Sequence, residues 1–168
     1  MATPAPDLDY DPYAWHDDTV YGMRFRTPDL ISPHLSPDGV PLQLASGDWT
    51  SAFILDIDHI VAWVRSEDGI RFRVAPADLI FLDACDLEMA IDWGDSAGEI
   101  GVHEPAIDHI IRVALPGATP STPSYRWRIV MNHPAGGEIV FRARGFELNL
   151  RRPPVLRDVQ RLPVSGRR

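Results

Sequence analysis

The sequence contains no lysine, because all 16 basic residues among its 168 are arginine. Arginine, alanine, proline and aspartate are enriched together by G+C-rich coding, so we interpret this bias as the mark of a bacterial source. The single cysteine, Cys85, excludes an internal disulfide framework and a zinc site built from several thiolates. The chain also has no apolar run near the roughly 18 residues of a membrane span, and no secretory signal at its start. These absences together predict a cytoplasmic protein.

The composition is that of a globular protein, with 45% hydrophobic and 24% charged residues. The net charge of −8 argues against general binding to nucleic acids, which requires a concentrated basic surface, and against adhesion to anionic membranes. Both ends are proline-rich and without periodicity. We therefore expect a flexible tail at residues 1–12, a single β domain at 13–151, and a Pro/Arg-rich C-terminal tail at 152–168.

Between these tails, apolar and polar residues alternate with a period of two, as in strands with one buried and one solvated face. In this pattern Trp63, Trp93 and Trp127 point toward the core. The inward parity changes at Gly145, which predicts a bulge or a bend, and Pro76 should end or kink its strand. The alternating runs lie at residues 53–63, 70–74, 87–93, 107–115, 127–131, 139–143 and 146–150.

Turn residues separate several of these runs, at 66–69 and 134–137, and hairpin loops join antiparallel neighbours. No run repeats at the helical period of 3.6 residues. The sequence therefore predicts an all-β fold, either an antiparallel sandwich or a short barrel, of about six to nine strands.

Two carboxylates inside the most apolar run are the first candidates for a site. Asp56 and Asp58 share one face of the expected strand, with about 7 Å between their Cα atoms. This pair suits a hard cation or acid–base chemistry. The alternative, which we favour, is a solvated face whose ion pairs contribute only about 0–1 kcal/mol. His59 faces the opposite side, as a hydrogen-bonded interior histidine.

His16 and Asp17 form a second candidate, because an aspartate can orient a neighbouring imidazole that acts as a general base. The competing interpretation is a turn that precedes the first strand. Arginines also project in pairs, two residues apart, from three of the expected strands. If these strands were neighbours they would form a ladder that meets the acids in ion pairs or binds an acidic partner. The pairs are Arg71 and Arg73, Arg126 and Arg128, and Arg142 and Arg144.

Several stretches resemble a group of small, uncharacterised bacterial proteins: WHD at 15–17 with YGMRF at 21–25, LDID at 55–58 with Trp63, FRVAPADL at 72–79, and IDWG at 91–94. The likeness spans roughly residues 13–150 and implies no activity. The order of an apolar, aromatic strand before a stretch rich in Phe and Asp is also similar to that in small immunity proteins of bacterial toxin systems. This second resemblance implies a toxin-neutralising role.

From these features we expect a non-enzymatic interaction protein that binds another protein through the polar, Arg- and Asp-bearing face of a sheet. It would require no cofactor and no metal, and it would bind neither nucleic acid nor membrane. An exposed edge strand would allow a homo-oligomer. The alternative is a β protein that binds a metal or small ligand, or a hydrolase, using Asp56, Asp58 and His16.

Overall fold

The computed structural model describes residues 10–26, 51–93, 103–119 and 121–167, and in these ranges nearly all regular structure is β-strand. The predicted all-β class is therefore confirmed. The elements are β1 (Thr19–Arg26), β2 (Ala52–Ser66), β3 (Gly69–Leu82), β4 (Cys85–Ala90), β5 (Ala106–Ala114), β6 (Tyr125–His133), β7 (Glu138–Ala143), β8 (Gly145–Leu150), β9 (Val155–Arg157) and one helical turn, α1 (Val164–Arg167).

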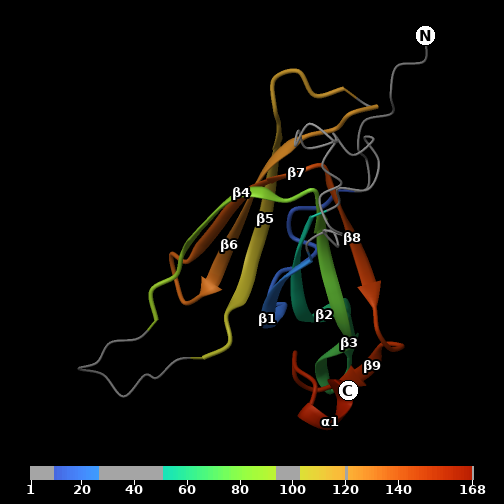
Figure 1. Ribbon diagram of the computed structural model, residues 1–168. Helices are drawn as coiled ribbons and strands as arrows, with labels where there is room; N and C mark the ends of the chain where they lie inside the picture. The colour runs from blue at the N-terminus through green and yellow to red at the C-terminus, as the bar shows by residue number, and fades with distance from the viewer. Residues whose placement is uncertain (1–9, 27–50, 94–102, 120, 168) are drawn as a thin grey trace, which may run out of the picture.

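The nine strands of the described residues form a single antiparallel sheet in the order β4-β7-β6-β5-β1-β2-β3-β8, and β9 also pairs with β3. The sheet folds over on itself, so that β4, β5, β6 and β7 lie opposite β1, β2, β3 and β8 (Figure 1). Within the described ranges the edge strands β4 and β8 are not paired with each other. The architecture thus combines the two facing layers of a sandwich with the continuous sheet of an incomplete barrel.

Aromatic side chains fill the space between the two halves of the folded sheet. Phe81 on β3 meets Trp127 on β6 and Phe141 on β7, with ring centroids 5.2 and 4.7 Å apart. Phe53 on β2 packs edge-on against Phe141 at 5.4 Å. Since these four side chains are almost fully buried, and edge-to-face contacts add to the free energy of apolar burial, they hold the halves together.

Two short connections join the halves of the sheet: the ladder between β1 and β5, and the chain crossing from β7 to β8. Thr19 and Ala106 are the ladder pair between β1 and β5. Arg144 alone separates β7, which belongs to one half, from β8, which pairs with β3 in the other. At this crossing Arg144 N donates to Leu82 O at 2.9 Å. The parity change at Gly145 therefore marks a real bend of the chain.

The expectation that Pro76 interrupts its strand is wrong, because β3 runs through it without a break. The carbonyl oxygen of Pro76 accepts a hydrogen bond from Arg151 N at 2.8 Å, where the chain leaves β8 and has not yet entered β9. In a strand, the N–H and C=O of one residue point to the same side. The missing donor thus faces the gap between β8 and β9, and the ladder with β2 loses nothing.

The prediction that Trp63 points toward the core is wrong, since 50% of its surface is exposed. A register shift between Ile60 and Ala62 inserts one extra residue into β2. Beyond such a bulge the side chains change faces, so Trp63 emerges on the outer face and stacks edge-on against Phe72 at 4.9 Å. Trp93 is also partly exposed, whereas Trp127 is buried as predicted.

The segments expected as tails are packed against the sheet in their described parts. Tyr10 contacts the rings of Trp15 and Trp127, and its hydroxyl donates to Ile110 O. At the other end, β9 pairs with β3 and Leu162 is buried. Residues 1–9 of the expected N-terminal tail lie outside the described residues. The C-terminal segment is thus a part of the fold that covers the outer face of β2 and β3.

Candidate functional site

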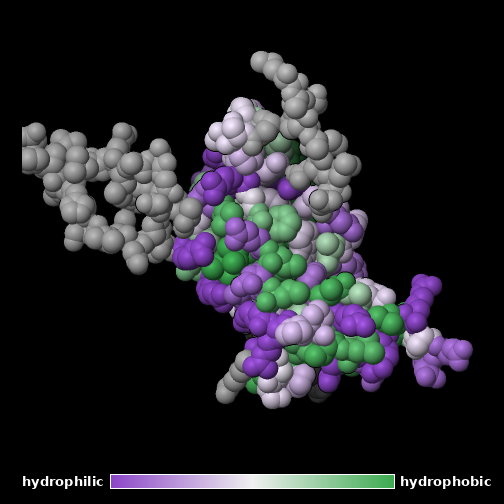
Figure 2. All heavy atoms as spheres, turned by 90° about the vertical axis from the view of Figure 1, so that its right-hand side faces the viewer, coloured by the Kyte–Doolittle hydropathy of each residue, from purple (hydrophilic) through white to green (hydrophobic). Residues whose placement is uncertain are grey.

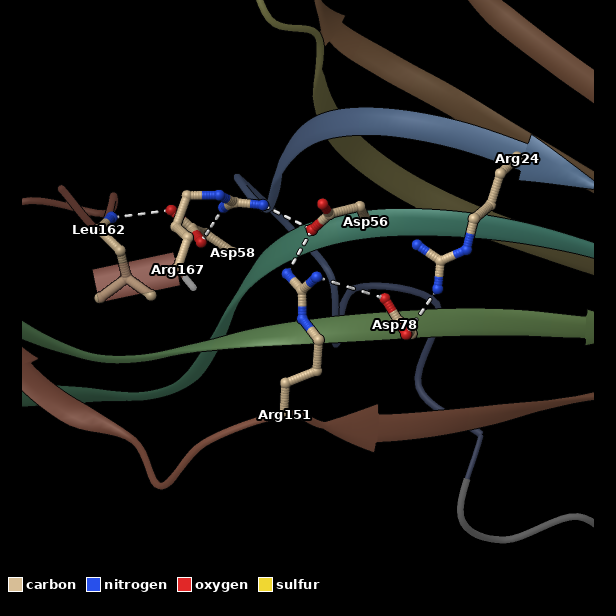
Figure 3. A network of polar contacts seen from close by, with 7 residues as sticks. All are labelled: Arg24, Asp56, Asp58, Asp78, Arg151, Leu162 and Arg167. Carbon is tan, nitrogen blue, oxygen red and sulfur yellow. Dashed lines mark hydrogen bonds and ion pairs between the residues drawn. The ribbon is translucent and has the colours of Figure 1, made fainter. Parts of the chain in front are cut away.

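The outer face of β1, β2 and β3 carries three aspartates that three arginines neutralise (Figure 3). Asp56 and Asp78 are direct cross-strand partners, an arrangement that is unfavourable for two like charges. Arg24 on β1 donates to Asp78 Oδ2 at 2.7 Å. Arg151, just after β8, donates to Asp56 Oδ1 at 2.5 Å and lies 3.8 Å from Asp78 Oδ1. Arg167 of α1 donates to the same Asp56 oxygen at 2.5 Å.

Asp58 is the most deeply placed acid of this group, with 0% of its surface exposed. Its Oδ2 accepts a hydrogen bond from Leu162 N at 2.7 Å, and its Oδ1 accepts one from Arg167 Nη1. Burial raises the pKa of Asp58, while the Leu162 amide, Arg167 and the Tyr21 hydroxyl act in the opposite direction. The expected solvated face is therefore wrong for Asp58, because residues 160–167 cover it.

Arg167 lies in a cage made of one aromatic ring and two carboxylates. Its guanidinium carbon lies 3.4 Å from the ring centroid of Tyr21, while its two terminal nitrogens reach Asp58 and Asp56. Burial, followed by the charge of Asp58, raises the pKa of Tyr21 to about 12. We call Tyr21, Asp56 and Asp58 the arginine cage. A cleft of about 690 Å³ opens beside it.

A buried Asp–His pair lies at the start of β1, where the sequence suggested His16 and Asp17 instead. His59 Nδ1 lies 2.7 Å from Asp18 Oδ2, and Ile60 N donates to Asp18 Oδ1 at 2.7 Å. Burial raises the pKa of Asp18 to about 6 against the lowering influence of His59. His59 is thus the interior, hydrogen-bonded histidine that the alternation predicts. Among the described residues, no serine, threonine or cysteine side chain hydrogen-bonds to it.

His16 and Asp17 tie the first turn to other parts of the fold. His16 lies within 3.2 Å of Asp17 and 3.4 Å of Asp108. Asp17 accepts hydrogen bonds from Asn132 at 2.5 Å and from Gln160 at 2.9 Å. In the described part of the chain, no hydrogen bond or ion pair joins His16 to the aspartates of β2. The structure therefore does not assemble His16, Asp56 and Asp58 into one centre.

Arg71 and Arg73 do not join the other arginines in a common ladder. Because β3 is continuous through Pro76, both lie on the strand face that carries the core residue Ala77, beyond the end of the core. Arg71 pairs with Asp158 at 2.7 Å, and Arg73 is exposed. They belong to one half of the sheet, whereas the remaining arginine pairs belong to the other.

The outer face of β6 and β7 carries three exposed arginines, and a fourth follows directly after β7. We call these four the basic face: Arg126, Arg128, Arg142 and Arg144. Three of them have acidic partners, with N–O distances of 2.6 Å to Glu138, 3.2 Å to Asp86 and 3.3 Å to Asp83 for Arg128, Arg142 and Arg144, respectively.

Arg126 has no such partner in the described part of the chain. Its direct cross-strand neighbour on β7 is Arg142, and its neighbour on β5 is Val113, which is 61% exposed. Like charges directly opposite one another destabilise a sheet. Arg126 is therefore the arginine of the basic face whose charge no acidic side chain of the described residues balances.

Apolar side chains are also exposed on β8 and β9, which both pair with β3. Figure 2 views the molecule from the side of these strands and shows hydrophobic residues gathered among hydrophilic ones. Leu148 and Leu150 are exposed on the face of β8 that is shared with the core residues Leu79 and Ala77, and Val155 is exposed on β9. A shallow cleft of about 310 Å³ lies between the β9 region and the segment that contains Leu162 and Pro163.

Comparison of the chain with family models, with curated proteins and with solved structures gives no match. The described ranges contain no group of three or more His, Cys, Asp or Glu side chains arranged to hold a metal ion. Nor does any helix in those ranges have the length and apolarity to span a membrane. The resemblance of the sequence to small bacterial proteins therefore stays a prediction.

Sequence reasoning found Asp56 and Asp58 but missed the groups that surround them. Tyr21, Asp78 and Arg151 come from segments far apart in the sequence. One signal in the sequence points to Arg167, namely the excess of arginine after residue 150. A domain with net negative charge attracts such a segment electrostatically. The sequence alone predicts a solvated tail, because nothing in it fixes where such a segment docks.

Proposed function

We propose that this is a non-enzymatic, cytoplasmic protein that binds an acidic protein partner through the basic face of β6 and β7. The observation that carries the proposal is the direct opposition of Arg126 and Arg142 across the two strands. Such a pair costs a few tenths of a kcal/mol in the free protein. A carboxylate from a partner, placed between the two guanidinium groups, removes that cost and accepts charge-assisted hydrogen bonds from both.

The surroundings of this pair suit a protein interface. Val113 exposes an apolar side chain next to Arg126, and arginine beside apolar surface is typical of the energetically dominant parts of interfaces. The sequence predicts a contact surface that contains both arginines and aspartates. We leave Asp56 and Asp58 out of that surface, because Arg151 and Arg167 already bind their carboxylates. Neutralisation of an acidic toxin is one concrete form of this function.

The substitution Arg126→Glu tests the proposal because it separates stability from binding. In the free protein it replaces a like-charged cross-strand pair with an ion pair, so the free energy of unfolding should rise by roughly 0.2–1 kcal/mol. Binding of an acidic probe, an oligoglutamate peptide, should weaken at least tenfold. NMR titration of the intact chain should show shifts centred on Arg126 and Arg142 that disappear at high salt.

Arg73→Glu is the matched control, since Arg73 is an exposed strand arginine in the other half of the sheet. It should leave affinity for the probe within twofold. The same pair of variants then applies to a partner isolated from the source cell. Equal loss of affinity in both variants, or shifts centred away from the basic face, contradicts the proposal.

A further inference from the structure

The arginine cage binds its guanidinium group in a way that a simple surface ion pair does not. Arg167 lies over the face of the Tyr21 ring, with 3.4 Å between the guanidinium carbon and the ring centroid. One terminal nitrogen donates to Asp58 and the other to Asp56. Only 11% of the Arg167 side chain is exposed, and Asp58 is fully buried. The cage therefore recognises three features of a guanidinium group: its planar face, its positive charge and its two separate terminal N–H donors.

We propose that Tyr21, Asp56 and Asp58 form a binding pocket for arginine side chains, which Arg167 fills from within the chain and which an arginine of another protein fills when residues 158–167 leave the sheet. The pocket selects arginine over lysine. An ammonium group is a compact charge that cannot place two separate donors on the two carboxylates while it stacks on the ring.

The segment that delivers Arg167 is attached in a manner that permits exchange. Among the described residues of 158–167, Leu162 is the buried apolar side chain, and its amide is the backbone group that donates to the sheet, through Asp58. No ladder pairs this segment with a strand, in contrast to β9. Val164 is 75% exposed. Most of the attachment thus comes from polar side-chain contacts, which water replaces at moderate cost.

The surface around the pocket gives an incoming chain room and additional contacts. The cleft of about 690 Å³ is lined in part by Tyr21, Asp56, Glu104 and Arg151, which stay in place when residues 158–167 leave the sheet. Competition with Arg167 requires these contacts, because a tethered side chain acts at an effective concentration in the millimolar range or above. Free arginine is therefore expected to displace Arg167 poorly, and a partner protein must offer apolar or basic neighbours to its arginine.

The decisive experiment empties the pocket and offers it a small guanidinium compound. The variant Arg167→Ala is titrated with N-acetyl-arginine methylamide, followed by the NMR signals of the Tyr21 ring and by Tm. We expect saturable binding in the millimolar range and a rise in Tm. The guanidinium N–H signals of the bound compound should shift upfield, because they lie over the Tyr21 ring. The intact chain and the control Arg152→Ala, which removes an exposed arginine of the same region, should bind at least tenfold more weakly.

Two further arms establish that the cage is responsible. N-acetyl-lysine methylamide should bind Arg167→Ala at least tenfold more weakly than the arginine compound. Adding Asp56→Asn should reduce binding of the arginine compound by a similar factor. Absence of saturable binding to Arg167→Ala, equal binding of the two compounds, or indifference to Asp56→Asn overturns the proposal.

Leu162→Ala replaces Arg167→Ala if the latter does not fold, because it loosens the segment and leaves the cage complete. The arginine compound should then bind Leu162→Ala more tightly than the intact chain. Equal affinity of the two proteins overturns the proposal.

Discussion

Replacement of Asp58 by alanine tests whether residues 160–167 belong to the fold. In the structure the carboxylate is fully buried and accepts hydrogen bonds from Leu162 N, Arg167 and Tyr21. The substitution leaves a buried amide without an acceptor, which costs about 1–3 kcal/mol. It also deprives a largely buried guanidinium of one of its two carboxylates, and breaking a buried ion pair costs about 3–5 kcal/mol.

These two costs overlap, and two effects offset them in part. Arg167 retains Asp56, and removing a carboxylate whose pKa burial has raised recovers some of the free energy spent on its desolvation. We therefore expect Asp58→Ala to lower the free energy of unfolding by about 3 kcal/mol. Asp58→Asn keeps a carbonyl oxygen for Leu162 N and should lose roughly half as much, because only the charge is removed.

Urea denaturation at pH 7 measures these differences. With a slope of about 2 kcal/mol per molar, the midpoint of Asp58→Ala should fall by roughly 1.5 M. Asp158→Ala is the control, since its carboxylate pairs with Arg71 but is 81% exposed, and such pairs contribute about 0–1 kcal/mol. An Asp58→Ala midpoint as close to that of the unaltered protein as the control's refutes the view that this segment buries Asp58.

In the same assay, Trp127→Ala should lower the free energy of unfolding by about 3–5 kcal/mol, because it is a large-to-small substitution in the core. Trp63→Ala should lower it by only about 1 kcal/mol, because half of the Trp63 surface is exposed. Equal losses for the two variants contradict the bulge in β2. Asp18→Asn should change the pH dependence of stability. The folded pKa of about 6 exceeds the unfolded value of 3.8, so the Asp18 contribution is fully present below pH 3.8 and is lost as the pH rises through 6. That loss is about 3 kcal/mol, and unfolding curves at pH 4 and 7 should show that the variant lacks it.

The class of the fold was predictable because a period of two survives in most strands. Trp127 and Phe141 follow it, and the turn at 66–69 joins β2 to β3 as expected. The errors arise where the period shifts without a signal in the sequence. An extra residue after Ile60 moves Trp63 to the outer face, and irregular pairing around His109 buries Ile110 in its place. Bulges are set by tertiary packing, which a single sequence does not record.

The candidate site was predictable only in its strand residues. Asp56 and Asp58 stand out as acids within an apolar run, and such acids require partners if they are buried. Their partners Arg151 and Arg167 lie about a hundred residues further along the chain, and no local rule connects them. Comparing the positions of opposite charges indicates the pairing. Acids within an apolar run need cationic partners, and the proline-rich, arginine-rich C-terminal segment supplies them.

The placement of β8 and β9 has a consequence for synthesis on the ribosome. Both strands add to β3, yet both are translated long after it, and β4 to β7 are made in between. Until they emerge, a nascent chain leaves one side of β3 open, with backbone groups free to pair with other molecules. We therefore expect the sheet to be completed only after β9 has left the ribosome, and chains stalled before β8 to depend on chaperones.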